Sequence, residues 1–486
     1  MTFFNATPGN DTFTGGILAD TVSYASASAG VKVSLAIPGP QNTGGSGIDT
    51  LTSIEALIGS SFGDNLSGSN ANDTIDGGAG VGSDTMAGGL GTDTVSYKSA
   101  TSGVNVKLSI SGALQDTGGA GFDQLSGFEN LTGSDFNDTL SGDGGSNVLN
   151  GGAGTDTVSY ANATGAVTVS LGIAGAQNTV GAGTDTLSGF ENLRGSNFND
   201  TLSGDAGDNV LNGGAGADTV SYGNALAGVT VSLSNAAQQN TGGAGLDTLS
   251  GFENLTGSGL NDTLSGDGGN NVLKGGAGAD TVSYANAAAG VTVSLGNAAQ
   301  QNTGGAGLDT LSGFENLTGS KYADRLTGDG LANTIDGGSG NDTLVASGGV
   351  DRLSGGGGGF WRFSGGLIGG GFTFTSYVDR FVFNAVADSP NGAPDVITDY
   401  DRGIGEKIDV SGIDANTLVA GNQAFTWVGN INFNPAILNR GELGYQVSGA
   451  DLMLIGNTAN VSGTPDFRVQ LQGAAATGII SSDVIL

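Results

Sequence analysis

Aspartates recur at a fixed position in a glycine-rich phrase of nine residues. The phrase is Gly-Gly-x-Gly-x-Asp-x-U-x, where U is apolar, and GGAGTDTVS from Gly151 to Ser159 is a clean copy. Its first half can form a tight turn, because glycine tolerates positive φ angles, and its aspartate adds a carboxylate to that turn. Carboxylate and carbonyl oxygens are the ligands that Ca²⁺ prefers. The spacing therefore indicates calcium binding, whereas a merely solvated acidic surface needs no nine-residue register.

Successive phrases should fall on alternate sides of a flattened coil, so that turns n and n+2 stack and line one gap. We expect calcium in the gap between the two aspartates of each stacked pair. This rule pairs Asp138 with Asp156, Asp200 with Asp218, Asp262 with Asp280, Asp324 with Asp342, Asp64 with Asp84, and Asp73 with Asp93. For any one aspartate, an Asx turn that caps its own backbone is the simpler explanation. The number of aspartates at one register favours calcium for the set.

The opposite side of the coil carries asparagine where the phrase calls for aspartate. These residues are Asn147, Asn209, Asn271 and Asn333. An asparagine offers a carbonyl oxygen but no charge, so we expect weak or no metal binding there, with hydrogen bonds in its place.

The composition excludes several classes of chemistry. The chain has 486 residues, 46 acidic against 14 basic side chains, a formal net charge of −32, no Cys and no His. Without His or Cys there is no His-based catalytic triad, thiol nucleophile, disulfide, or His- or Cys-ligated zinc site. The negative charge argues against a nucleic-acid partner, which needs a basic face. Oxygen ligands for a hard cation remain.

The elements that must position these aspartates are short strands. Clean phrases begin at Gly151, Gly213, Gly275 and Gly337, which is a period of 62 residues. Each period also holds a longer alternating run, such as Val-Thr-Val-Ser-Leu at 229–233, and a short Phe-Glu-Asn-Leu phrase. Such self-similarity, with three-residue strands that each carry one inward apolar residue, predicts an all-β chain, a parallel β-roll or β-helix solenoid. Frequent glycine and the lack of a 3.6-residue period argue against helices.

The Phe-Glu-Asn-Leu phrase raises the alternative of a carboxylate site. The simpler interpretation places Phe and Leu in the core, Asn in a hydrogen-bonded ladder, and Glu in solvent. The glutamates concerned are Glu129, Glu191, Glu253 and Glu315.

Three regions differ in composition. Residues 1–345 carry the repeats, and residues 346–378 form a Gly-rich junction with the aromatics Phe360, Trp361, Phe363 and Phe372. We expect this junction to cap the solenoid or to act as a linker, with an aromatic ligand patch as the alternative. From residue 379 to 486 glycine thins and strand-like runs appear at 380–383, 424–428, 452–455 and 467–471. These predict a small β-sandwich-like C-terminal domain.

Two resemblances to known families follow from these motifs. The nonapeptides of residues 6–345 resemble those of the repeats-in-toxin (RTX) family. Residues 379–486, with DRFVFNAVADSPNGAPDVITDYDRGIGEKIDVSGIDAN, resemble the C-terminal domain of serralysin-type metalloproteases, and the final Asp483-Val-Ile-Leu486 resembles that family's terminal signal. The resemblance implies type I secretion. The protease zinc motif His-Glu-x-x-His cannot exist without His, so proteolysis is not implied.

These observations lead to a functional hypothesis. The N-terminal residues lack the basic and apolar regions of a signal peptide, and no apolar run reaches transmembrane length. We expect a secreted, extracellular protein, exported by the type I apparatus, that binds several Ca²⁺ ions and folds on them. Its expected role is non-enzymatic: structural, matrix or surface interaction, with a cell surface, matrix polysaccharide or a second copy as partner. The alternatives are a polysaccharide-modifying enzyme on a β-helix and a calcium-dependent adhesin or surface-layer protein.

Overall fold

The computed structural model describes most of the chain, in two compact units. The described residues are 1–356, 360–364, 371–375, 378–385, 388–389, 394–400, 405–413, 415, 423–430, 438–458, 466–474 and 479–486, with the backbone alone at 360–364, 371–375 and 429–430. One unit comprises Met1–Asn224 and Ala236–Phe252, and the other comprises Ala225–Asn235 and Glu253–Leu486. Within these ranges the chain forms strands and a 3-10 turn, η5 (Ser481–Asp483), without an α-helix. The described part therefore holds no helix with the length and apolarity of a membrane span.

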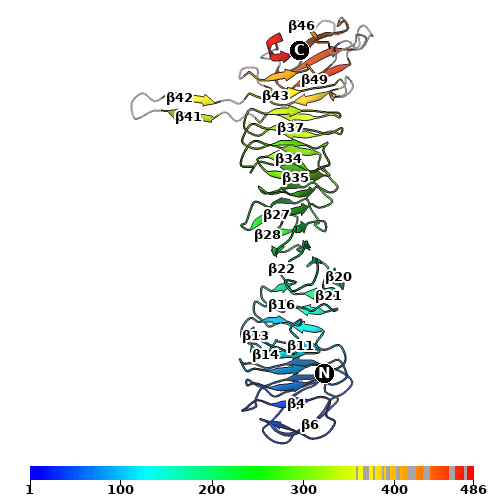
Figure 1. Cartoon of the computed structure of the whole chain (residues 1–486), viewed down its shortest axis with the longest axis vertical. Coiled ribbons are helices and arrows are strands. Elements are labelled where there is room, and N and C mark those ends of the chain that lie inside the picture. Colours follow the sequence, from blue (N-terminus) through cyan, green and yellow to red (C-terminus); the bar gives the residue numbers. More distant parts are fainter. Residues whose placement is uncertain are drawn as a thin grey trace. The chain divides into compact units, whose positions relative to one another are not determined.

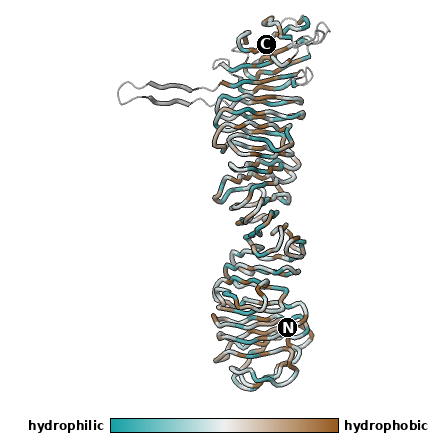
Figure 2. The backbone as a smooth tube through the Cα atoms, viewed as in Figure 1, coloured by the Kyte–Doolittle hydropathy of each residue, from teal (hydrophilic) through white to brown (hydrophobic). Residues whose placement is uncertain are grey.

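Each nonapeptide supplies one turn and one three-residue strand. The middle residue of each strand points into the coil, as do Leu140, Leu149 and Val158, each with no exposed side-chain surface. The alternation follows from the two-residue period of a strand, since the preceding residue, Thr139, Val148 or Thr157, is exposed or partly exposed. Figure 2 shows hydrophobic positions recurring from coil to coil within each unit. Burial of each such side chain stabilises the fold by about 1.5–3 kcal/mol.

The first unit consists of parallel sheets that run along successive coils (Figure 1). The longest contains, in spatial order, β1 (Phe3–Asn5), β3 (Thr21–Ser23), β7 (Ala56–Ile58), β9 (Thr74–Asp76), β11 (Thr94–Ser96), β15 (Asn130–Thr132), β17 (Val148–Asn150), β21 (Gly183–Ser188) and β20 (Gln177–Val180). A second contains β12 (Asn105–Lys107), β16 (Thr139–Ser141), β18 (Thr157–Ser159), β22 (Asn192–Arg194), β24 (Val210–Asn212), β28 (Gly245–Ser250) and β27 (Gln239–Gly242).

Three further sets of strands complete this unit. They are β4 (Lys32–Ser34), β8 (Asn65–Ser67), β10 (Thr85–Ala87), β14 (Gly121–Ser126) and β13 (Leu114–Gly118); β2 (Thr12–Thr14), β6 (Gly47–Thr52) and β5 (Gln41–Gly44); and β19 (Thr168–Ser170), β23 (Thr201–Ser203) and β25 (Thr219–Ser221). Strands of alternate phrases pair in register, as in Leu140 of β16 beside Val158 of β18. The predicted stacking of turns n and n+2 is confirmed.

In the long segment of each period, one sheet ends and another begins. In the first unit β19 starts a new sheet with β23, whereas β21 ends the sheet of β17 and is covered by the antiparallel strand β20. The hairpin closes through residues 180–183, and its last strand carries the phrase Gly183–Ser188. A column of stacked turns therefore runs for several coils and then ends at a hairpin.

The second unit repeats this arrangement. One set of strands contains β29 (Asn254–Thr256), β31 (Val272–Lys274), β35 (Gly307–Ser312) and β34 (Gln301–Gly304). The longest sheet contains β26 (Thr230–Ser232), β30 (Thr263–Ser265), β32 (Thr281–Ser283), β36 (Asn316–Thr318), β38 (Thr334–Asp336), β40 (Arg352–Ser354), β44 (Asp395–Ile397), β49 (Phe467–Leu471), β48 (Asp451–Asn457), β47 (Glu442–Ser448) and β46 (Thr426–Asn430). A third sheet contains β33 (Thr292–Ser294), β37 (Arg325–Thr327), β39 (Thr343–Val345), β43 (Arg380–Val382), β45 (Lys407–Asp409) and β50 (Val484–Ile485).

The C-terminal strands continue the parallel sheets of the repeats. β43 pairs with β39, and β44 pairs with β40, so parallel pairing crosses the predicted boundaries at 345 and 378. The antiparallel strands β47, β48 and β49 then extend one sheet. The all-β parallel β-roll is confirmed, and the three-region division and the sandwich-like C-terminal detail stay predictions.

The junction contains one hairpin in the described backbone. β41 (Phe360–Ser364) pairs antiparallel with β42 (Gly371–Thr375), and Figure 1 shows the two strands side by side. The side chains of the four junction aromatics lie outside the described residues, so their predicted cap, linker or ligand roles stay predictions.

Candidate metal centre

The six predicted aspartate pairs are stacked in the structure. In each pair the backbone N–H of the first aspartate donates to Oδ1 of the second, one coil further on. The donor–acceptor distances are 2.8 Å for Asp138 to Asp156, 2.7 Å for Asp200 to Asp218, 2.8 Å for Asp262 to Asp280, 2.9 Å for Asp324 to Asp342, 2.7 Å for Asp64 to Asp84, and 2.8 Å for Asp73 to Asp93. The turns of each pair therefore face one another across a single inter-coil gap.

All twelve aspartates are buried, with at most 6% of their surface exposed. Burial raises the pKa of several of them, and like charges on neighbouring coils add to this. The pKa rises to about 8 for Asp84 and Asp342 and to about 6 for Asp156. Withdrawal from water disfavours the ionised carboxylate unless a positive charge or hydrogen bonds compensate. A cation between the coils would provide that compensation.

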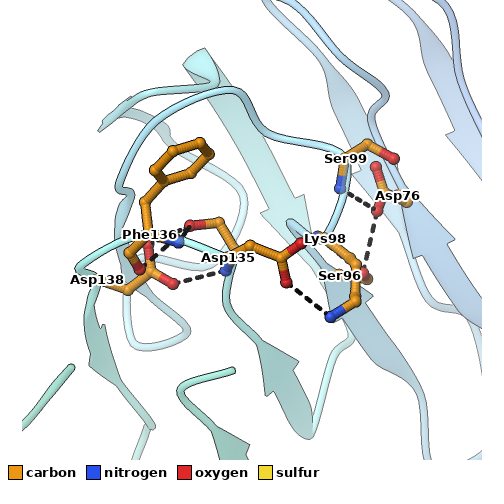
Figure 3. Close-up of polar contacts among 8 residues, drawn as sticks. Asp76, Ser96, Lys98, Ser99, Asp135, Phe136 and Asp138 are labelled. Atoms are coloured by element: carbon orange, nitrogen blue, oxygen red, sulfur yellow. Dashed lines mark hydrogen bonds and ion pairs between the residues drawn. The ribbon is translucent and has the colours of Figure 1, made fainter. Parts of the chain in front are cut away.

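The first aspartate of each pair lies in a turn that we call a Ser turn, with serine four residues before the aspartate. In the turn of Asp138, the Ser134 N–H donates to Oδ2 at 2.5 Å and the Ser134 hydroxyl donates to Oδ1 at 2.7 Å. Val104 of the preceding coil donates its N–H to Oδ1 at 2.7 Å. Figure 3 shows Asp138 held in this turn, while the adjacent Asp135 pairs with Lys98 at the surface. A carboxylate has about four acceptor positions, and Asp138 uses three of them.

The second aspartate of most pairs lies in a Gly turn, with glycine at the serine position. Asp156 Oδ2 is buried and accepts no hydrogen bond, although Oδ1 accepts the Asp138 N–H. The cause is the backbone of Gly152, whose φ of +108° turns its peptide away from the conformation that Ser134 adopts. The same open Oδ2 occurs at Asp93, Asp280 and Asp342.

Glutamates of the Phe-Glu-Asn-Leu phrase continue these columns, and the expectation that they face solvent is wrong. Glu191 is half-buried, and its Oε2 accepts the Asp156 N–H at 2.7 Å. Glu129 and Glu315 accept from Asp93 and Asp280 in the same way, each at 2.8 Å. The phrase is shorter than a nonapeptide, so the longer side chain reaches the position that aspartate occupies elsewhere. The other expectations for it are confirmed, since Phe and Leu are buried and Asn accepts from the next coil.

The asparagine turns are held by hydrogen bonds, as predicted. Asn147 Nδ2 donates to the Glu129 carbonyl at 2.7 Å, and its Oδ1 accepts the Asp143 N–H at 2.9 Å. Its backbone N–H donates to Asp185 Oδ1 at 3.1 Å. Asn209, Asn271 and Asn333 make the equivalent Nδ2 bonds. The amide thus supplies a donor where a metal would need an acceptor.

A buried tyrosine–aspartate pair that was not predicted from the sequence occurs in four of the long segments. Asp185, in the hairpin phrase that ends a column, accepts a hydrogen bond from the Tyr160 hydroxyl at 3.0 Å. The pKa of Tyr160 is raised by burial and by this carboxylate. Equivalent bonds join Tyr97 to Asp123, Tyr222 to Asp247 and Tyr284 to Asp309. The available signal was the tyrosine that directly follows the phrases beginning at Gly151, Gly213 and Gly275.

Three further acids were missed near the C-terminal strands. The Asp351 N–H donates to Asp395 Oδ1 at 2.8 Å, and the Asp342 N–H donates to Asp379 Oδ1 at 2.9 Å. Burial raises the pKa of Asp351 to about 7 and of Asp395 to about 8. The stacked carboxylates therefore extend past the last clean nonapeptide. Of these three aspartates, only Asp351 occupies the aspartate position of a repeat phrase, in residues 347–354.

The donor set in these gaps fits a hard cation. Open carboxylate oxygens lie beside glycine carbonyls: a methyl group on Gly151 would collide with the Gly189 carbonyl oxygen and would touch Asp156 Oδ2. Among the described residues no three acidic side chains meet at one point, so two acids and backbone carbonyls make up each gap. Ca²⁺ accepts such mixed oxygen ligands and completes its shell with water.

Comparison with known families agrees with this arrangement. The RTX calcium-binding nonapeptide repeat matches four copies at residues 58–95, 126–158, 185–220 and 256–286. The peptidase M10 serralysin C-terminal model matches residues 330–486. No match was found among curated proteins.

Two solved structures are similar to parts of the chain. The AlgE6R2 subunit of the Azotobacter vinelandii mannuronan C5-epimerase is 22% identical, covering 42% of this chain and 91% of its own, with a TM-score of 0.20. The AlgE6R3 subunit of the same enzyme is 21% identical, covering 46% and 78%, with a TM-score of 0.20.

The fold and these matches together identify RTX-type calcium-binding nonapeptide repeats within the chain. The particular chain combines those repeats with a serralysin-type C-terminal domain, and both predicted resemblances are confirmed. Neither matched model is a protease catalytic domain. The combination indicates an extracellular protein of the type I secretion route that binds Ca²⁺.

Proposed function

We propose that the protein is a secreted structural or surface-interaction protein whose repeats fold when Ca²⁺ enters the gaps between stacked aspartate turns. The ligands would be the six pairs listed above, together with glycine carbonyls of the same turns. The supporting observation is the stacking of twelve buried aspartates in pairs on adjacent coils, each pair joined by a backbone N–H that donates to a carboxylate. Burying two like charges side by side is costly, and a bound cation removes that cost.

The chain's own residues account for a folding switch. Without calcium, aspartates on successive coils repel one another at the distance of one strand spacing, about 4.8 Å. Calcium between the coils converts this repulsion into attraction, and its binding free energy becomes folding free energy. Extracellular calcium modules have Kd values of about 10⁻⁴–10⁻³ M. The protein would therefore be unfolded in calcium-poor cytosol and folded outside the cell.

Two pockets on the described surface do not favour the enzymatic alternative. One pocket of about 120 Å³ is lined by Ser141, Asp143, Ser159, Asn162 and backbone glycines, and a similar one of about 150 Å³ lies at the equivalent positions two periods on. Each of these two contains a single acid, whereas glycoside chemistry needs a pair. A third pocket, of about 180 Å³, is lined by two acids, Glu315 and Asp329.

Calcium titration of the full chain tests the proposal. Circular dichroism in EDTA should show little β-signal, and added Ca²⁺ should produce a cooperative gain at millimolar concentration or below. Mg²⁺ at the same concentration is the control, because it demands a tighter octahedral shell. A chain that folds fully in EDTA and ignores calcium would refute the function. Sedimentation at each calcium concentration would separate folding from self-assembly, which the adhesin and surface-layer alternatives require.

A further inference from the structure

One column of stacked turns shows which gap has unsatisfied oxygens. The column contains Val104, Asp138, Asp156, Glu191, Asn209 and Asp247, in this spatial order. Each is bonded to the next, chiefly by a backbone N–H that donates to the side-chain oxygen of the following coil. Oδ1 or Oε2 therefore faces the preceding coil, which leaves the second oxygen for other partners.

The second oxygens of this column have different partners. Oδ2 of Asp138 accepts the Ser134 N–H, and Oδ2 of Asp247 accepts the Tyr222 hydroxyl at 2.9 Å. The amide of Asn209 donates to the Glu191 carbonyl at 2.9 Å. Oδ2 of Asp156 has no donor, although Asp156 is only 1% exposed. Asp156 Oδ2 lies beside Gly151, and the Gly189 carbonyl of the following coil closes over the same glycine.

The open oxygen is therefore directed into the gap between Asp156 and Glu191, not into the gap between Asp138 and Asp156. We call this the Glu gap, lined by Asp156 Oδ2, the Glu191 carboxylate and the Gly189 carbonyl. The same arrangement occurs at Asp93, Glu129 and Gly127, and at Asp280, Glu315 and Gly313. In all three, two like charges lie on adjacent coils with a buried, unpartnered oxygen between them.

We propose that each Glu gap is a calcium site, with the glutamate of the Phe-Glu-Asn-Leu phrase as a metal ligand. This rests on the proposed calcium-binding function and adds to it a site outside the tandem nonapeptides. Two carboxylates supply charge and a carbonyl supplies a neutral ligand, while the half-buried glutamate leaves room for water. Calcium fits this set better than Mg²⁺, because it tolerates irregular geometry.

Glu55 provides a matched control within the same chain. Its Oε2 accepts the Asp20 N–H at 2.9 Å, as the other glutamates do for their aspartates. The Oδ2 of Asp20, however, accepts the Gly16 N–H at 2.5 Å, so no open oxygen faces Glu55. A glutamine at any of these positions keeps a carbonyl acceptor for the backbone and removes the charge.

Equilibrium dialysis of the full-length protein with radioactive Ca²⁺ tests the site by counting bound ions. The triple variant E129Q/E191Q/E315Q should bind three fewer ions than the wild type, E191Q should bind one fewer, and E55Q should bind the same number. Circular dichroism at saturating calcium checks that the single variant keeps its β-signal. An unchanged count in the triple variant, or an equal loss in E55Q and E191Q, would overturn the site while leaving the proposed function intact. A wild type that binds no calcium would refute the function itself.

Discussion

The hydroxyl of Tyr160 donates a hydrogen bond of 3.0 Å to Oδ2 of Asp185, and both side chains are buried. Asp185 occupies the position of the nonapeptide aspartate, and its phrase ends a column of turns. Its Oδ1 accepts the Asn147 N–H, and the Thr179 hydroxyl also reaches Oδ2. Here a hydroxyl supplies the hydrogen that satisfies the carboxylate. We therefore expect no cation at Asp185.

Replacing Tyr160 by phenylalanine should destabilise the protein without changing its calcium count. The substitution leaves a buried carboxylate oxygen short of a donor, at a cost of about 1–3 kcal/mol. The urea midpoint in saturating calcium should fall. Tyr322→Phe is the control, because that side chain is 41% exposed. Equal midpoints for the two variants would contradict a structural role for the hydroxyl.

Replacing Asp156 by asparagine should weaken calcium-dependent folding. The variant removes one charge from both gaps that Asp156 lines, and the calcium midpoint should rise by about tenfold, equivalent to about 1.4 kcal/mol. The exposed Asp135, which pairs with Lys98 at the surface, is the control, since such pairs contribute about 0–1 kcal/mol. Asp135→Asn should leave the midpoint within a factor of two or three. A similar shift in both variants would indicate a general charge effect.

Replacing Gly152 by alanine should prevent its turn from closing. Gly152 has φ +108°, and a methyl group there would collide with the Ser134 carbonyl. The strained backbone alone costs about 1–3 kcal/mol. Gly144→Ala is the control, because a methyl group at Gly144 meets open space. Thermal unfolding in calcium should show a lower midpoint for the first variant, and comparable midpoints would mean that the turn tolerates a side chain.

The stability of the calcium-free chain should fall as the pH rises, because the pKa values of buried aspartates are raised and not lowered on folding. The folded pKa values of Asp156, Asp84 and Asp342 are raised to about 6, 8 and 8, above the unfolded value of about 3.9. The folded state therefore binds more protons than the unfolded state between about pH 4 and 8, and its stability falls as pH rises through that window.

Circular dichroism of calcium-stripped protein should accordingly show more β-structure at pH 5 than at pH 8. In saturating calcium the trend should reverse, because Ca²⁺ binds the deprotonated carboxylates. A calcium-free β-signal that grows with pH would contradict the raised pKa values.

The sequence predicted the coil and the pairing of its turns because both depend on local rules. A nine-residue period with one apolar residue per strand allows one way to bury Leu140 and Val158 in every coil, and the paired aspartates follow from that stacking. The local phrase pattern also predicted that Asn147 is held by hydrogen bonds. The sequence also showed that the Phe-Glu-Asn-Leu phrase is shorter than a nonapeptide. It did not show that this difference brings the Glu191 carboxylate into the column of stacked aspartates.

What the sequence by itself determined is therefore the repeat, its parallel coils and the set of acidic turns. The tertiary structure decided which oxygens in those turns are satisfied, because their donors come from other coils or from the conformation of one residue. Ser134 and Gly152 occupy the same phrase position, but only Gly152 has a positive φ angle. The Ser134 N–H donates to Oδ2 of Asp138, whereas Oδ2 of Asp156 accepts no hydrogen bond. Tyr160 reaches Asp185 across 25 residues, and Glu191 reaches Asp156 across 35. Such contacts depend on how coils of unequal length stack, which no single phrase encodes.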